Sequence, residues 1–167
     1  MQVSRILIPA AFFQQVWLGS SIFLSWIVAP ILFSRFGAEI GADVMGAIFP
    51  VYGWILALCS GICAAAAAIV FQSRSQYGPK ASLAGLVIGS VSFLLALLQA
   101  FYVFPRSHAL RLVVKGGRAS GNIDAVSEQA AEMMRLHGLS MTINMGLILA
   151  AIFMFWYFQH NLRRLGR

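Results

Sequence analysis

The chain has 167 residues, of which 60% are hydrophobic and only 10% are charged. Soluble domains carry about 25% charged residues, so this composition excludes an ordinary soluble domain and predicts an integral membrane protein whose main partner is the lipid bilayer. The formal net charge of +7 then indicates basic residues beside membrane spans and no nucleic-acid partner.

Four stretches without Asp, Glu, Lys or Arg predict the membrane-spanning helices. They cover approximately residues 6–33, 48–72, 81–104 and 136–161. At about 1.5 Å per residue, each is long enough to cross a hydrocarbon core of roughly 30 Å. The first stretch is too long for the apolar region of a secretory signal, which favours a retained helix. We therefore expect one all-α domain over residues 1–167, a four-helix bundle in the membrane.

A polar segment, residues 105–135, separates the third and fourth stretches, and we expect it outside the membrane. Residues 108–114 have the pattern of a short amphipathic helix on the membrane surface, and residues 115–122 have the composition of a turn. Asn122 or Asp124 can then cap a helix that continues into the fourth span.

The basic residues predict the orientation. Four spans place both termini on one side, and the two sides carry equal numbers of Lys and Arg. On the side of the termini, the basic residues are confined to short tails and one tight turn that contain no acidic residue: Arg5, Arg74, Lys80, Arg163, Arg164 and Arg167. Short basic segments beside a membrane favour the cytoplasm, so we expect both termini there.

Small residues at a spacing of four predict close helix contacts. Gly85 and Gly89 lie on the third span, and Gly61 and Ala65 lie on the second. Such ridges let helix backbones approach one another. They fit packing within one chain, and the Gly85/Gly89 ridge fits a homo-oligomer as well.

The start of the fourth span carries polar groups that lipid cannot satisfy. Met133, His137, Met141 and Met145 recur every four residues, and Asn144 follows His137 by seven, so these side chains fall near one helix face. Imidazole and carboxamide groups are costly in lipid, which predicts that this face points into protein.

Other segments supply what this face contacts. His108 follows the third span and lies at the membrane level of His137, while Phe33, Phe49, Pro50 and Tyr52 flank the expected loop on the same side. We therefore expect an outer-side pocket. Its candidate ligand-binding residues are His108, His137, Asn144, Gln99 and Tyr52. Gln99 and Asn144 have similar depth, which allows the two amides to pair.

Metal binding is one hypothesis for this pocket, because imidazole, thioether and thiol groups suit a soft ion such as copper. The candidate ligands are His108, His137, Met141, Met145, Cys59 and Cys63. Haem b with two axial histidines is a less favoured alternative. Met and Cys also fill apolar interiors, so packing alone explains the methionines and the cysteine pair equally.

The spans contain no charged residue, which argues against a proton relay. The chain also has no nucleotide-binding, serine-hydrolase, zinc-protease or haem-attachment motif, so we expect no enzyme. The leading hypothesis is a multi-pass membrane protein that binds a soft metal ion or small ligand in the pocket. The alternative is an accessory or assembly subunit of a larger membrane partner.

Short motifs along the chain carry a family resemblance. They are Trp17-x-Gly19, Ala29-Pro30, Phe49-Pro50-x-Tyr52, Leu110-Arg111, and Leu136-His137 with Asn144. Through these motifs the chain resembles the small four-helix membrane proteins grouped with transmembrane protein 205, which are known in bacteria as a domain of unknown function. The resemblance implies a multi-pass protein, which we expect in the bacterial inner membrane. The animal member is associated with platinum-drug resistance, which is compatible with soft-metal handling.

Overall fold

The computed structural model describes residues 2–72, 79–121 and 126–165, and the regular elements in these ranges are all helical. In chain order they are α1 (Gln2–Ile22), the π-helical segment η1 (Phe23–Val28), α2 (Ala29–Gln72), α4 (Pro79–Leu98), the π-helical segment η2 (Gln99–Val103), α5 (Phe104–Ala119) and α6 (Ser127–Leu165). The all-α class is therefore confirmed. The expected helix caps, Asn122 and Asp124, lie outside the described residues.

The expected four-helix bundle is wrong. Within the described ranges, three helical segments are long and apolar enough to cross a membrane: Arg5–Gln72, Ser82–Ala119 and Ser127–Arg163. The first has 68 residues and contains both of the first two expected spans. No loop separates those spans, because the chain reverses at the single residue Gly37 (φ 79°, ψ 172°). This backbone conformation is open almost only to glycine, which lets the chain change direction without a connecting segment.

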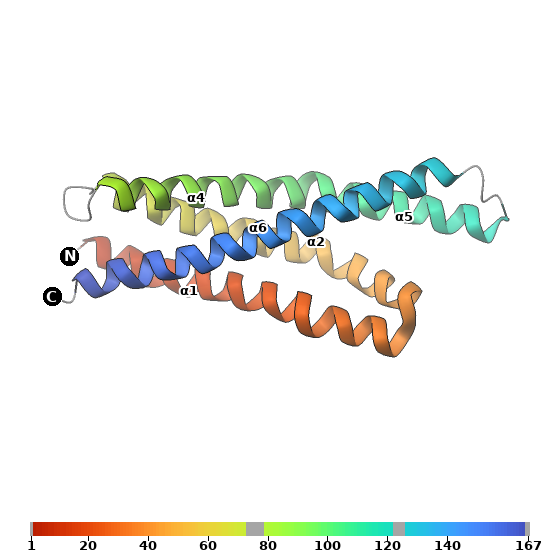
Figure 1. Ribbon diagram of the computed structural model, residues 1–167, viewed down its shortest axis with the longest axis horizontal. Coiled ribbons are helices and arrows are strands. Elements are labelled where there is room, and N and C mark those ends of the chain that lie inside the picture. The colour runs from red at the N-terminus through yellow and green to blue at the C-terminus, as the bar shows by residue number, and fades with distance from the viewer. Residues whose placement is uncertain (1, 73–78, 122–125, 166–167) are drawn as a thin grey trace.

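Gly37 divides the 68-residue segment into two antiparallel arms (Figure 1). Across the arms, the Tyr52 hydroxyl donates a hydrogen bond to Ser21 Oγ (2.7 Å), and Cys63 Sγ lies 3.7 Å from the Ala10 carbonyl oxygen. Both pairs are centred between residues 36 and 37. This is the register of a hairpin that turns at Gly37.

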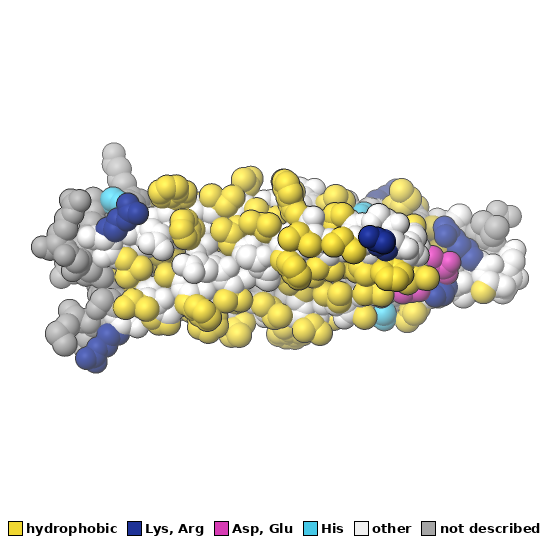
Figure 2. Space-filling model, turned by 90° about the horizontal axis from the view of Figure 1, so that it is seen from below, with side chains coloured by type: hydrophobic (Ala, Val, Ile, Leu, Met, Phe, Trp, Pro, Cys, Tyr) yellow, Lys and Arg dark blue, Asp and Glu magenta, His cyan; other side chains and the backbone are white. Residues whose placement is uncertain are grey.

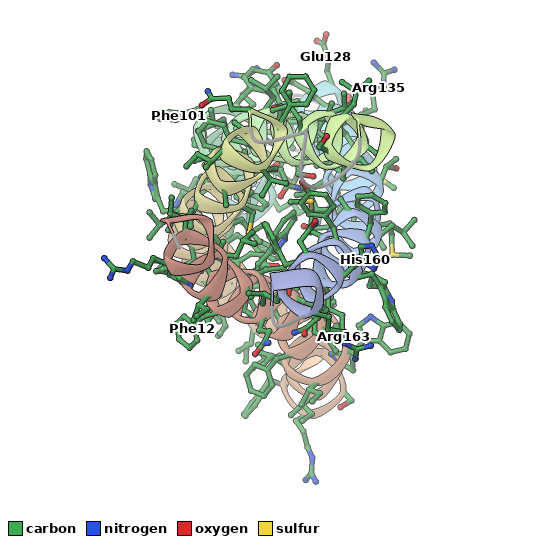
Figure 3. All side chains as sticks on the ribbon, turned by 90° about the vertical axis from the view of Figure 1, so that its left-hand side faces the viewer. Phe12, Phe101, Glu128, Arg135, His160 and Arg163 are labelled. Carbon is green, nitrogen blue, oxygen red and sulfur yellow. The ribbon has the colours of Figure 1, made fainter. Side chains whose placement is uncertain are left out.

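The helices surround a common core, as Figure 3 shows along the long axis of the molecule. The largest fully buried side chains include Trp17, Leu56, Leu147, Met154 and Phe158. In contrast, Phe12 and Phe101 point away from the core, and their side chains are 60% and 63% exposed. In a membrane protein, such outward aromatic side chains contact lipid.

The Gly85/Gly89 ridge faces the interior of the molecule. A Cβ atom on Gly85 would overlap the Tyr157 ring of α6, and one on Gly89 would lie 3.1 Å from the Cα atom of Ala64 in α2. The ridge therefore brings α4 close to α2 and α6 within one chain. A homo-oligomer through this ridge would need the same surface, which the chain already occupies.

The charged side chains divide the molecule into an apolar middle and two polar ends. Figure 2 shows hydrophobic side chains along the middle, Lys and Arg toward both ends, and the visible Asp and Glu at one end. That end is formed by α5 and the start of α6, which an ion pair between Arg106 and Glu132 joins at 2.9 Å. Helix α6 has 39 residues, or about 58 Å at 1.5 Å per residue, which exceeds a hydrocarbon core of roughly 30 Å.

The α5/α6 end therefore projects beyond the hydrocarbon. The polar segment contributes to this projection differently from the expectation. Residues 108–114 continue the third helix without a break, through η2 and α5, and do not form a separate helix on the membrane surface. Residues 115–118 are also helical, and the turn begins only at Ser120.

The reversal predicts opposite effects for alanine at two exposed glycines. Gly37→Ala places a side chain in open space but at a positive φ, so we expect it to lower the free energy of unfolding by about 1–3 kcal/mol. Gly19→Ala also enters open space but lies inside α1, where alanine is favoured by roughly 0.5–1 kcal/mol. Thermal unfolding of both variants in one detergent measures the difference. Equal stabilities would contradict a reversal that requires glycine.

The ridge predicts a packing defect for a large residue at Gly89. Gly89→Leu must push α4 away from the backbone of α2, so we expect a loss of about 1–3 kcal/mol in thermal unfolding. Gly146→Leu on α6 is the control, because a Cβ atom there meets nothing within 4 Å. A Gly89→Leu protein of normal stability but smaller assembled size would instead assign the ridge to contacts between chains.

Candidate ligand-binding cavity

A cavity of about 490 Å³ lies near the charged end, between the reversal at Gly37 and the α5/α6 pair. Its lining comes from η1, α2, α5 and α6. The polar lining residues are Ser25, Tyr52, Ser107, His108, Arg111, His137, Ser140 and Asn144. The other described lining residues are apolar or glycine, and none of them is a carboxylate. The volume falls in the range of about 300–1,000 Å³ that is typical of small-molecule sites.

The cavity lies between contacts that hold the helices together on either side of it. Gln14 in α1 donates through Nε2 to the Ala151 carbonyl oxygen in α6 (2.8 Å). Phe49 in α2 stacks on Phe104 in α5, with ring centroids 5.1 Å apart. From the first contact, α1 and α6 diverge toward the charged end (Figure 1), and the cavity occupies the space that their divergence leaves.

The structure brings most of the expected ligand-binding residues together. Tyr52, His108, His137 and Asn144 all line the cavity, and so does Met141. The aromatic side chains expected beside them, Phe33 and Phe49, line it too, whereas Pro50 does not. The expectation that the loop-side residues lie near the start of the fourth span therefore holds, although those residues belong to a helix and not to a loop.

Gln99 lies outside the cavity lining, and the expected amide pair with Asn144 is wrong. The Gln99 side chain is fully buried, and its Nε2 donates to the Ser140 carbonyl oxygen in α6 at 3.1 Å. The acceptor residue, Ser140, lies one helical turn before Asn144 on α6. Gln99 therefore joins η2 to α6 beside the cavity, and Asn144 remains directed to the cavity.

The expected soft-metal ligands are dispersed. Cys59 and Cys63 are free thiols buried in the core, and Met145 lies outside the cavity with a 56% exposed side chain. His108, His137 and Met141 alone share the cavity. Within residues 2–72, 79–121 and 126–165, no group of three or more His, Cys, Asp or Glu is arranged to hold a metal ion. Both cysteines pack in the hydrophobic core, and Cys63 contacts Ala10 of the opposing arm.

The hydrogen-bonding groups on the cavity wall have free capacity. Among the described residues, the side chains of His108, His137 and Asn144 have no hydrogen-bond partner. Both histidines are exposed, and Asn144 is half-buried. A polar group near lipid that is not satisfied by the protein is costly unless water or a ligand satisfies it. The wall therefore presents unused donors and acceptors to an occupant.

Sequence reasoning missed Arg111, Ser107, Met45 and Gly46, which all line the cavity. Arg111 follows His108 by three residues, so helical spacing was a usable signal for it. Gly46 lies across from the same histidine, because a Cβ atom on Gly46 would be 3.8 Å from His108 Nδ1. Met45 and Gly46 fall between the first two expected spans, where a loop interpretation gives no spacing to follow.

The two π-helical segments adjoin the cavity. η1 supplies Leu24 and Ser25 to the lining, and η2 ends directly before Phe104. π-helical turns occur frequently at functional sites, because they re-aim side chains out of the regular helical pattern. In η1 no side chain is buried, so packing in the core does not account for this segment.

An apolar hollow of about 460 Å³ adjoins the cavity and shares Leu24 and Tyr52 with it. Its other lining residues are Ser20, Phe23, Ala47, Ile48, Val51 and Ile55. The polar cavity thus lies beside a hollow with almost only hydrocarbon on its walls. A molecule with a polar head and an apolar tail matches the polar cavity and the apolar hollow beside it.

Comparisons with known proteins identify a family whose description assigns no activity. The family model described as "Domain of unknown function (DUF4149)" matches residues 12–114. An "Uncharacterized protein" of Aquifex aeolicus (strain VF5) is 28% identical over 136 residues, which cover 81% of this chain and 83% of the relative. No solved structure matches the chain. These findings support a bacterial domain of unknown function, and they give no support to a likeness to transmembrane protein 205.

The cavity wall predicts different stability effects for two of its residues. Tyr52→Phe removes the buried hydrogen bond to Ser21 and should lower the free energy of unfolding by about 1 kcal/mol. His137→Ala removes an exposed side chain without a described partner, so we expect a change within about 0.5 kcal/mol. Thermal unfolding in one detergent measures both variants. A His137→Ala protein as unstable as Tyr52→Phe would make His137 a packing residue.

Proposed function

We infer the function of this protein from its cavity. The chain belongs to the DUF4149 family, and the description of that family assigns no function. The proposal is that the protein is a non-enzymatic, multi-pass membrane protein that binds a small amphiphilic molecule. The head of this molecule contacts the polar wall around His108, His137 and Asn144. Its tail follows the apolar hollow beside Leu24 and Tyr52.

One observation carries this proposal: side chains with no hydrogen-bond partner among the described residues line a cavity that adjoins an apolar hollow. An amphiphile satisfies both parts at once, since its head pairs with the free groups and its tail buries apolar surface. Water satisfies only the first part, and bilayer hydrocarbon satisfies only the second.

A bound soft metal ion is less well supported than an organic ligand. A metal site needs ligands that close on the ion at about 2.0–2.3 Å, whereas the imidazole and thioether groups here line a space of about 490 Å³. Among the described residues, the expected thiol ligands lie in the core, away from these groups. A haem with two axial histidines requires both imidazoles to face one iron inside the cavity, whereas the side chains of His108 and His137 are both exposed.

The absence of an enzyme activity is part of the proposal. The cavity wall has no carboxylate, so a carboxylate acid or base is missing there. Ser107 and Ser140 line the cavity, but among the described residues neither makes a hydrogen bond to a histidine that would activate it. Binding without a covalent step fits these groups best.

We further propose that the protein lies in the bacterial inner membrane with both ends of the described chain in the cytoplasm. Three apolar helical segments and a bacterial relative support a bacterial membrane. Helices α1 and α6 bring the start and end of the described chain to the same end of the molecule (Figure 1), opposite the carboxylates. The basic, acid-free composition of that end favours the cytoplasmic side.

A second candidate function is that of an accessory subunit in a larger membrane complex. It is favoured by α6, in which only 22% of the spanning window is buried, against 44% and 33% in the other two segments. Such a helix has a broad outer face for a partner helix. Gentle solubilisation followed by mass measurement tests this candidate, which predicts a stoichiometric larger partner.

A cavity-filling variant tests the binding function. Gly46→Phe directs a ring into the cavity, since a Cβ atom at this position meets nothing nearer than His108 at 3.8 Å. We expect it to weaken the binding of dodecanol and dodecanoate by about tenfold or more, as measured by thermal stabilisation in a neutral detergent. Mass spectrometry of extracts from the purified wild type should also find an amphiphile that Gly46→Phe lacks.

Gly138→Phe is the matched control, because this exposed glycine of α6 lies outside the cavity lining and a Cβ atom there meets nothing within 4 Å. Equal binding by Gly46→Phe and wild type would refute the proposal. Elemental analysis and a visible spectrum of the same samples test the alternatives. A stoichiometric metal or a haem band that disappears in His137→Ala would replace the amphiphile with that cofactor.

A further inference from the structure

We propose that the cavity selects an amphiphile with an anionic head, a carboxylate or a phosphate, and that Arg111 is the residue that recognises it. This inference rests on the proposed function and deepens it from an amphiphile of any head to one of stated charge. Fatty acids and phosphate-headed lipids share this chemistry. The argument depends on the geometry of Arg111 and on the charges around the cavity.

The Arg111 guanidinium is held in place by α2. Its Nε donates to Asp43 Oδ1 at 3.0 Å, and its Nη2 donates to the Glu39 carbonyl oxygen at 2.9 Å. Its other terminal nitrogen, Nη1, donates to no described residue. Arg111 lines the cavity, and its side chain is only 23% exposed. A fixed guanidinium with a free N–H edge is preorganised to bind a carboxylate or phosphate.

The neighbouring carboxylate does not neutralise this edge. Asp43 is shared between two cations, because its second oxygen accepts from Lys115 Nζ at 2.9 Å. Glu39 approaches the same Lys115 at only 3.9 Å, and its side chain is 77% exposed. Neither Asp43 nor Glu39 lines the cavity. Among the described residues, the cavity lining therefore has one permanent positive charge, Arg111, and no negative charge.

The remaining polar lining favours the same kind of head. Asn144, Ser107 and Ser140 can each donate a hydrogen bond, as can either histidine. A carboxylate or phosphate accepts several such bonds at once, whereas an alcohol head accepts few and a cationic head accepts none. The positive charge of Arg111 attracts an anionic head and repels a cationic one, so it favours the same choice.

The position of the cavity is compatible with a head drawn from the membrane interface. Arg111 and His108 belong to α5, at the end where the charged side chains begin, whereas Asn144 lies about two helical turns deeper than His137. A head at Arg111 would therefore remain near the polar interface. Its tail would then run inward past Asn144 toward the hollow at Leu24 and Tyr52.

A matched pair of probes tests the head charge. Dodecanoate and dodecanol have the same chain length, so their binding to the full protein, purified in a neutral detergent, differs only through the head. We expect dodecanoate to bind about tenfold more tightly than dodecanol, by thermal stabilisation or calorimetry. Dodecyl phosphate is the third arm: tighter binding than dodecanoate assigns a phosphate head, and weaker binding assigns a carboxylate head.

Three variants assign the preference to a residue. Arg111→Gln should abolish the preference for dodecanoate over dodecanol. Arg106→Gln is the control, because Arg106 also lies on α5 and forms an ion pair, with Glu132, but does not line the cavity. Arg111→Lys keeps the charge and should keep part of the preference, which provides a measurement if Arg111→Gln does not fold.

Asp43→Asn separates recognition from a merely structural ion pair. Loss of this carboxylate removes the negative charge that contacts both Arg111 and Lys115, so an anion-binding role predicts tighter dodecanoate binding. A structural role predicts that Asp43→Asn and Arg111→Gln weaken binding alike, because each breaks the same contact. Opposite directions for the two variants support the proposal, and equal losses overturn it.

The outcomes also separate this inference from the proposed function. Equal binding of dodecanoate and dodecanol to the wild type, with both lost in Gly46→Phe, would overturn the anionic head and leave the amphiphile cavity in place. A preference that persists in Arg111→Gln would overturn the role of Arg111. Unchanged binding of both probes in Gly46→Phe would instead refute the cavity itself.

Discussion

The reversal at Gly37 determines where the other features of the molecule lie. A positive φ at one exposed glycine lets the chain turn back without a loop, and the two arms then pair in a register centred on that residue. Because the arms continue as helix almost to the turn, α2 carries Asp43, Met45 and Gly46 on a regular face opposite α5. A flexible loop in their place would not hold Asp43 against Arg111 or form one wall of a cavity.

The buried amides of the molecule are used in two distinct ways. Gln14 and Gln99 each donate to a backbone carbonyl of α6, and both are fully or almost fully buried. They join helices where no water is available, which is the usual use of an amide within a membrane. Asn144 has the same functional group on α6 but no described partner, and it faces the cavity. Gln14 and Gln99 thus each form a contact between helices through Nε2, whereas Asn144 forms none among the described residues.

Much of this organisation was accessible from the sequence, and the exceptions have physical causes. The apolar stretches predict the helices, and the four-residue spacing from Met133 to Met141 predicts the face that lines the cavity. The reversal was not predictable, because residues 34–47 carry charge and three glycines, and such composition is as typical of a loop as of a helix that extends beyond the hydrocarbon. Polarity was taken to end the third helix at the membrane surface, but that helix continues beyond it through η2 and α5, whereas the extension of the fourth helix into the polar segment was expected.

The exposed rim of the cavity has a consequence for the concentration that the site experiences. Met141 and Phe33, which line the cavity, are 58% and 42% exposed. If the proposed amphiphile enters past these side chains from the bilayer, partitioning at about 0.8 kcal/mol per methylene concentrates it there far above its level in water. Occupancy then follows the mole fraction in the leaflet. A site that is weak by aqueous standards can therefore remain filled, and it can report on membrane composition.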